Sequence, residues 1–167
     1  MVLRVNNTTI DIKKKSMAGT ITDGESAVLN DEMLERKITV VTECFTGKLP
    51  ELILKDRNRL SKENAMTLCE YVIAMKREIN PRYNYVRYTI QFLSELSRTV
   101  GLDEKFIDMT RDDLLSYLDK SRKPENEDPL HRWIGSYNTR CVTLFRFFKW
   151  LHYPNITSPK KRSELSS

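Results

Sequence analysis

Near its carboxyl end, this chain gathers side chains that could hold phosphate groups. Residues 130–162 contain seven Lys and Arg residues and no Asp or Glu. Arginine, lysine, serine and threonine donate to the phosphate oxygens of nucleic acids. A helical wheel centres the apolar stripe near Cys141 and puts a polar set opposite it. This set comprises Arg132, Ser136, Thr139, Thr143, Arg146 and Trp150, with Arg140 and Lys149 at its edges. Because a solvated helix face normally mixes both charges, a face without carboxylates indicates a polyanion partner.

A second set of polar residues has the chemistry to read base edges. Asn84, Arg87, Tyr88, Gln91 and Arg98 lie opposite the apolar stripe Val86–Leu93 on a predicted helix. Arginine recognises guanine edges, and asparagine and glutamine recognise adenine. The alternative is an ordinary solvent-facing surface, which Glu95 on the same side favours.

Other site chemistries find no support in the sequence. His131 and His152 have no Cys, Asp or Glu at ligand spacing, so we expect no metal site. The chain contains no Gly-rich phosphate loop, G-x-S-x-G or H-E-x-x-H motif. Its tyrosines are typical of the edge of a core, where the ring is buried and the hydroxyl is exposed to solvent. We therefore predict no enzyme activity, no cofactor and no small-molecule ligand.

Composition limits the domain organisation and the location. A chain of 167 residues allows one ordinary domain plus tails. The three cysteines have no C-x-x-C spacing, which fits a reducing compartment. No apolar run approaches the ~18 residues that cross a bilayer, and the start of the chain lacks an apolar signal core. These features predict a cytoplasmic protein without membrane association.

The elements that must position these side chains are helices. Apolar spacings of three and four predict helices over 61–79, 80–100 and 110–118, and a fourth from Leu130 or Ser136 to His152. Ser61 is a candidate N-cap, Asn80-Pro81 a candidate helix start, and Gly101 a candidate stop. Thr110 and Asp113 have the spacing of a capping box. We predict an all-α, compact bundle of about four helices with a disordered N-terminal tail.

Aromatic residues define the expected domain boundaries. Of the 15 Phe, Trp and Tyr residues, 14 lie between positions 62 and 153. We expect residues 1–44 to be a mostly disordered tail, with room for a short helix near 31–37. Residues 45–60 are expected to be a docking segment or linker, residues 61–153 the helical domain, and residues 154–167 the start of an interdomain linker.

Several motifs within residues 62–153 have a familiar order. Paired helices surround EYV at 70–72 and YTIQFL at 88–93, and MTRDDLLSYL follows at 109–118. Tyr137-Asn138 then precedes LFRFFKWL at 144–151. The chain resembles the N-terminal core-binding (SAM-like) domain of tyrosine recombinases and phage-type integrases. The stretch PLHRWIGSYN at 129–138 is similar to archaeal integrases, particularly those of the ammonia-oxidising group.

This resemblance implies a DNA-binding role without catalysis. In the family, the core-binding domain grips one side of the duplex, and a separate C-terminal domain supplies the catalytic residues and the nucleophilic tyrosine. The chain ends soon after the fourth helix, so it is expected to be a fragment, a truncated reading frame or a free-standing domain. The implied partners are double-stranded DNA and full-length integrase or other recombinase subunits.

The resemblance assigns DNA contacts to two helices and the linker. Phosphate or groove contacts are expected from Arg132, Ser136, Thr139, Arg140, Thr143, Arg146 and Lys149. Major-groove contacts are expected from Arg82, Asn84, Arg87, Tyr88 and Gln91, and the basic run Lys160, Lys161 and Arg162 resembles the start of the interdomain linker.

An alternative hypothesis is a helical protein–protein interaction module. Exposed aromatic residues mark such interfaces, and Trp133, Phe147 and Trp150 are the candidates for an exposed patch.

Overall fold

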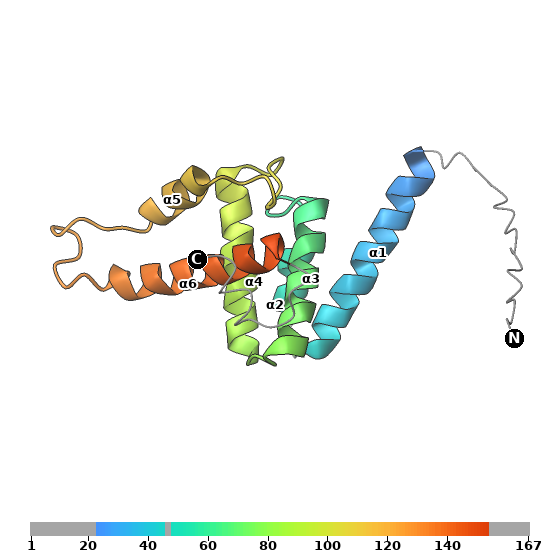
Figure 1. The fold of residues 1–167 in the computed structure, drawn as a ribbon, viewed down its shortest axis with the longest axis horizontal. Helices are drawn as coiled ribbons and strands as arrows, with labels where there is room; N and C mark the ends of the chain where they lie inside the picture. The colour runs from blue at the N-terminus through green and yellow to red at the C-terminus, as the bar shows by residue number, and fades with distance from the viewer. Residues whose placement is uncertain (1–22, 46–47, 154–167) are drawn as a thin grey trace, which may run out of the picture.

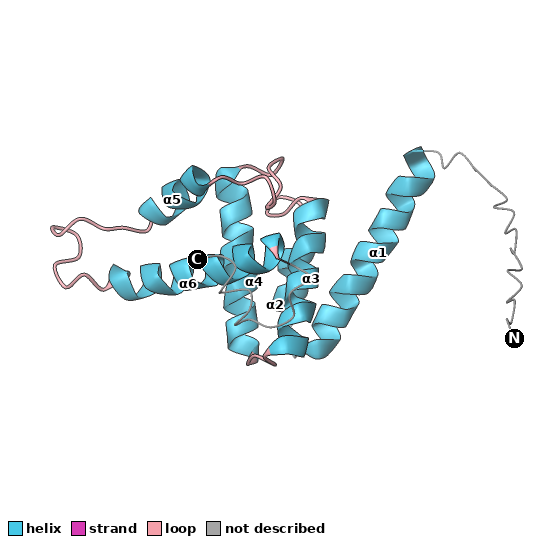
Figure 2. Ribbon diagram, in the orientation of Figure 1, coloured by secondary structure: helices cyan, strands magenta, loops and turns pink. Residues whose placement is uncertain are grey.

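The computed structural model describes residues 23–45 and 48–153, and these ranges contain six helices and no strand. The all-α prediction is therefore confirmed, although four helices were expected. In chain order, the helices are α1 (Asp23–Cys44), α2 (Leu49–Lys55), α3 (Lys62–Glu78), α4 (Tyr83–Val100), α5 (Arg111–Asp119) and α6 (Trp133–His152) (Figures 1 and 2). Within the described ranges, no helix has the length and apolar character to cross a membrane.

The first helix replaces part of the predicted disordered tail. α1 buries Leu34, Ile38 and Val41 at spacings of four and three, and Phe45 continues this face. Ion pairs also join α1 to its neighbours, including Asp31 to Lys62 on α3 at 2.7 Å. The short helix expected near 31–37 is part of α1, but the predicted disorder is wrong for the rest of this helix. The polar composition of the segment hides one narrow apolar stripe that α3 covers. The rest of the predicted tail lies outside the described residues.

The short helix α2 packs against α1, α3 and α4. Pro50 occupies the first turn, where its missing N–H leaves no hydrogen bond unmade. Ile53 and Leu54 are buried. The segment 45–60 therefore adds apolar side chains to the core.

Local capping signals place most of the remaining helix ends. The backbone N–H of Asn64 donates to Ser61 Oγ at 3.2 Å, and Thr110 and Asp113 form both bonds of a capping box. Gly101 ends α4 with φ 145°, a conformation that side chains rarely adopt. The predicted helix start at Asn80 is wrong, because Asn80 has φ 43° and follows the end of α3.

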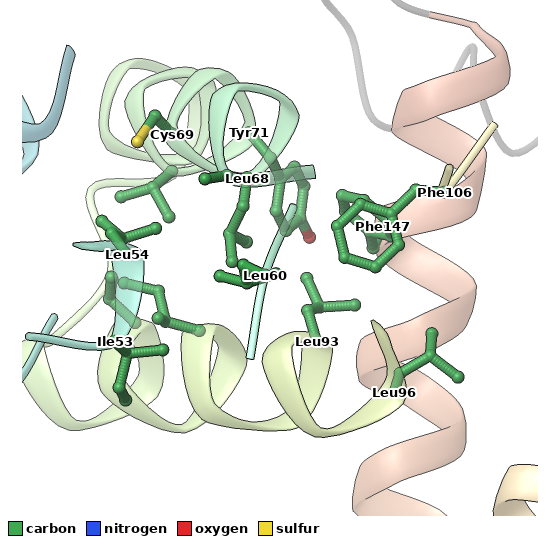
Figure 3. Close-up of a cluster of buried hydrophobic side chains, with 14 of the residues drawn as sticks. Ile53, Leu54, Leu60, Leu68, Cys69, Tyr71, Leu93, Leu96, Phe106 and Phe147 are labelled. Carbon is green, nitrogen blue, oxygen red and sulfur yellow. The ribbon is translucent and has the colours of Figure 1, made fainter. Parts of the chain in front are cut away.

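A single apolar cluster joins α6 to the first four helices. Phe147 of α6 is fully buried and lies 5.1 Å from the ring of Tyr71 on α3 and 5.0 Å from that of Phe106 (Figure 3). Beside this cluster, the buried Asn64 side-chain amide donates to Ser97 Oγ (3.0 Å) and to the Glu104 carbonyl (2.8 Å). Its oxygen also accepts the backbone N–H of Phe106 at 2.9 Å. Apolar packing thus fixes α6 against α3, and the satisfied polar hub ties α3, α4 and the loop that carries Phe106 together.

Candidate nucleic-acid interface

The rotation of α6 differs from the predicted one. Thr143 and Trp150, expected on the outer face, are buried together with Phe147. Burial costs Thr143 no hydrogen bond, because its hydroxyl donates to the Thr139 carbonyl at 2.9 Å. Trp150 packs against Tyr71, with ring centroids 5.1 Å apart. Thr143 is therefore removed from the candidate DNA contacts.

The predicted aromatic interaction patch is also wrong. Phe147 and Trp150 are buried, and Trp133 is half-buried with its ring against Tyr137. The exposed apolar side chains of α6 are instead Ile134, Val142 and Phe145. A helix with apolar residues around most of its circumference does not reveal in its sequence which of them its neighbours will cover.

The structure brings the two predicted polar faces together at a corner between α4 and α6. Arg146 of α6 donates from Nη1 to the hydroxyl of Tyr85 on α4 at 3.0 Å. This hydrogen bond raises the pKa of the Arg146 guanidinium above its ordinary value, so the group is always charged. Thr139 is exposed about two turns nearer the start of α6, and Lys149 is half-buried about one turn nearer its end. This α4–α6 corner is the candidate interface.

Arg140 connects the corner to α5. Its guanidinium lies 3.6 Å from the Glu95 carboxylate of α4 and also contacts the faces of the Phe92 and Tyr117 rings. Burial raises the pKa of Tyr117 to about 12, so this phenol stays neutral at physiological pH. Glu95 already balances part of the Arg140 charge, and Arg140 is half-buried. Arg140 therefore has a structural role besides any contact with phosphate.

A polar hollow of about 630 Å³ lies at the amino-terminal end of α6. It brings together the predicted residues Arg132, Ser136 and Arg140, and its remaining lining is Glu95, Lys120, Ser121, Lys123, Glu127, Asp128 and Trp133. The Asp128 carboxylate accepts the backbone N–H of Trp133 at 3.0 Å, which satisfies one free donor at the start of the helix. Because both charges line the hollow, this end of the corner is less attractive to an anion than the end around Arg146.

The predicted base-reading residues lie on the solvent side of α4. Asn84, Tyr88 and Gln91 are exposed, as is Arg82 just before the helix. Arg87 is half-buried, with its guanidinium 4.8 Å from the centre of the Tyr88 ring. Four of the five candidates are therefore exposed on α4 or just before it, and the fifth, Arg87, is half-buried.

Sequence reasoning left one nearby cation out of the site. Arg59, from the turn between α2 and α3, lines a smaller hollow of about 220 Å³. The rest of this lining comes from α4: Gln91, Ser94, Glu95 and Arg98. Arg59 also pairs with Asp56 at 3.0 Å. The two arginines of the turn Arg57-Asn58-Arg59 could have indicated a cation near the site. They lie in the segment 45–60, which was expected to be a docking segment or linker.

The remaining predicted cations, Lys160, Lys161 and Arg162, lie outside the described residues. Among the described residues, no group of three or more His, Cys, Asp and Glu is arranged to hold a metal ion. Comparisons of the chain with family models, curated proteins and solved structures found no match. The resemblance to recombinase core-binding domains thus rests on the motifs alone.

Proposed function

We propose that this chain is a non-catalytic DNA-binding domain that acts in DNA integration or site-specific recombination in the cytoplasm. The observation that carries the proposal is the α4–α6 corner. Residues 79–94 and 129–153 contain no carboxylate, and Arg146 joins these two stretches through Tyr85. A surface rich in cations, hydroxyls and amides, in which Glu95 is paired with Arg140, suits the phosphate backbone and the base edges of DNA.

The two helices have different tasks in this proposal. Arg146 of α6 and Arg132 just before that helix hold phosphate oxygens, which positions the domain on the duplex. Asn84 and Gln91 of α4 contact base edges, where an amide pairs with adenine. Specificity therefore comes mainly from α4, and most of the affinity comes from α6.

A domain that contacts one side of a duplex binds weakly and mainly through charge. About four to six neutralised phosphates give a slope near −4 to −5 when the logarithm of the binding constant is plotted against that of salt concentration. Affinity then falls steeply between low and physiological salt.

Fluorescence anisotropy with a labelled duplex of about 30 base pairs, at several salt concentrations, tests the proposal. We expect Arg146→Glu to weaken binding at least tenfold. The matched control is Arg36→Glu, because Arg36 is an exposed arginine on α1 and its only ion pair with a described residue is a long one, to Glu32 at 3.9 Å. The same charge reversal on α1 should leave affinity within about twofold of wild type, which separates the corner from net charge.

Two results contradict the proposal. One is the absence of binding by the wild-type chain at low salt. The other is an equal loss in Arg146→Glu and Arg36→Glu, which means that only net charge attracts the DNA. Thermal unfolding of both variants, followed by circular dichroism, shows that each is folded.

A further inference from the structure

α1 carries a second apolar stripe, which the rest of the described chain leaves uncovered. Leu29, Met33 and Val40 are all exposed. They lie on the side of the helix opposite the buried Leu34, Ile38 and Val41. Arg36, whose side chain is 81% exposed, interrupts this stripe between Met33 and Val40. A stripe of large apolar side chains at helical spacing indicates a surface that another helix covers.

α6 carries an uncovered stripe of the same kind. Ile134, Val142 and Phe145 are exposed on the side opposite the buried Leu144 and Phe147. The exposed Asn138 interrupts this stripe between Ile134 and Val142. Its Phe145 end borders the α4–α6 corner, because the Lys149 ammonium lies 3.9 Å from the centre of the Phe145 ring. The rest of the stripe lies farther from α4 than Arg146 does on the helical wheel.

The two stripes match in length and in the place of their polar residue. Leu29 and Val40 are eleven residues apart, as are Ile134 and Phe145, a distance of about 16 Å along a helix. Arg36 lies seven residues after Leu29, and Asn138 lies seven residues before Phe145. When the helices run antiparallel, the polar residues face each other and apolar residues face apolar ones. A parallel arrangement puts Asn138 against Met33 instead.

We infer that α1 of one copy docks antiparallel on α6 of a second copy, with Leu29 against Phe145, Met33 against Val142, Arg36 against Asn138, and Val40 against Ile134. The Asn138 side-chain oxygen can accept a hydrogen bond from the Arg36 guanidinium. Charges at the edges are complementary: Glu32 and Glu43 are exposed on α1, whereas α6 carries cations and no acid.

The occupant is a second copy because the two helices do not meet within one chain. α1 and α6 make no contact with each other in the described chain, and Figure 1 shows α1 at one end of the molecule and α6 extending toward the other. Two α1 helices paired antiparallel would put Arg36 against Met33. Two α6 helices would bring together two cationic faces without acids. Pairing of unlike faces avoids both conflicts.

This geometry has a defined consequence for assembly. The contact is heterologous, so each copy keeps one free face and further copies can add. A single helix pair is a small interface, and we expect association in the range of about 10–100 µM.

Sedimentation velocity of the full chain, from a few micromolar to several hundred micromolar, tests the inference. Met33→Glu blocks the α1 face and Val142→Glu blocks the α6 face, at positions that are 49% and 48% exposed. Each variant alone should remain monomeric. Their equimolar mixture should form a heterodimer and nothing larger, because each copy supplies the face that the other has lost. Recovery in the mixture also shows that both variants are folded.

The control variant is Ile107→Glu, at a loop position that is 49% exposed and outside both stripes. It should associate like wild type, and Asn138→Asp should tighten association severalfold by facing Arg36 of the second copy. A wild-type chain that stays monomeric, or a mixture that does not associate, overturns the inference. A weakening by Asn138→Asp overturns the antiparallel register. No DNA is present, so the result is independent of the proposed DNA-binding function.

Discussion

The cations on the α1–α3 side of the molecule differ from those at the α4–α6 corner. On the first side, lysines sit in ion pairs that link separate helices: Lys37 with Glu70, Lys55 with Glu35, and Lys62 with Asp31. At the corner, Arg82, Arg87 and Arg132 form no salt bridge with any described residue, and the partner of Arg146 is a phenol. Arg140, paired with Glu95, is the exception.

This difference separates two uses of positive charge within one chain. An exposed ion pair contributes only about 0–1 kcal/mol, but its carboxylate cancels the field of the cation. A cation without a carboxylate neighbour keeps its field and can release counterions from DNA when it contacts a phosphate. The arrangement of acids therefore locates the candidate DNA surface better than the net charge of +5 does.

The largest expected effect comes from breaking the packing that joins the two sides. Phe147→Ala removes the ring that contacts Tyr71 and Phe106, and we expect the free energy of unfolding to fall by about 3–5 kcal/mol. Urea unfolding measures this loss. The matched control is Phe145→Ala on the same helix, where the ring is exposed and the expected change is within about 0.5 kcal/mol. Equal losses in the two variants would contradict the observed rotation of α6.

The second prediction compares the two kinds of cation directly. One double variant, Arg82→Gln with Arg146→Gln, removes two positive charges from the corner. The other, Lys55→Gln with Lys62→Gln, removes two from the α1–α3 side. The corner pair should lower DNA affinity roughly 50-fold at 0.1 M salt and make the salt slope shallower by about 2. The lysine pair should change affinity by no more than about threefold, because its charges are already balanced by Glu35, Glu51 and Asp31.

Anisotropy titrations at three or more salt concentrations give both the affinity and the slope. A loss of affinity in the corner pair without a change of slope would show that these arginines do not contact phosphates. Equal losses in the two pairs would remove the distinction between balanced and unbalanced cations.

The third prediction concerns pH and the buried side of α3. Burial raises the pKa of the Cys69 thiol from its ordinary 9.0 to about 12. Above pH 9 the unfolded chain loses this proton while the folded chain keeps it, so the free energy of unfolding falls as pH rises from about 9 toward 12. The loss that Cys69 causes should reach about 1 kcal/mol by pH 10.

Cys69→Ala isolates this contribution, because all other titrating groups remain. Urea unfolding at pH 7 and pH 10 should show a smaller decrease in the variant than in wild type. Alkylation at pH 8 should also modify the half-buried Cys44 and Cys141 before Cys69. Parallel pH dependences, or rapid modification of Cys69, would contradict its buried position.

Several helix ends could be predicted from sequence, but the faces that α1 and α6 bury could not. Ser61, Gly101 and the Thr110–Asp113 box act on backbone groups within a few residues, so their effect can be recognised without the tertiary structure. Only a short part of α1, near 31–37, was expected, because its buried stripe is narrow and becomes favourable only when α3 covers it.

The candidate site shows the same limit. Thr143 and Phe145 are two residues apart on α6, and the polar one is buried while the aromatic one is exposed. Threonine can satisfy its hydroxyl within its own helix, so composition did not identify the covered side. Neighbouring helices decided the rotation. By contrast, the outer face of α4 has few apolar residues, and Asn84, Tyr88 and Gln91 are exposed there, opposite the buried stripe as expected.

The smallest expected effect on DNA affinity concerns the ion pair between Arg140 and Glu95. This pair is the exception among the arginines of the corner, which otherwise form no salt bridge with a described residue. Glu95→Gln removes the carboxylate from the corner, so Arg140 behaves like the other cations there. DNA affinity should rise by about threefold at 0.1 M salt, since one repulsive charge is lost and one cation is released. Glu51→Gln is the matched control: the Glu51 side chain has the same 37% exposure as Glu95, and it also pairs with a cation, Lys55.

The control removes the same charge from the α1–α3 side, where Lys55 keeps its ion pair with Glu35 and lies away from the corner. Its affinity should therefore stay within measurement error of wild type, and both variants should keep their unfolding free energies within about 1 kcal/mol. If Glu95→Gln lowers DNA affinity instead, Glu95 must help recognition, either by accepting from a cytosine amino group or by holding Arg140 in its binding position. The corner would then resemble the α1–α3 side, with paired charges that act together, and the placement of carboxylates would no longer distinguish the two.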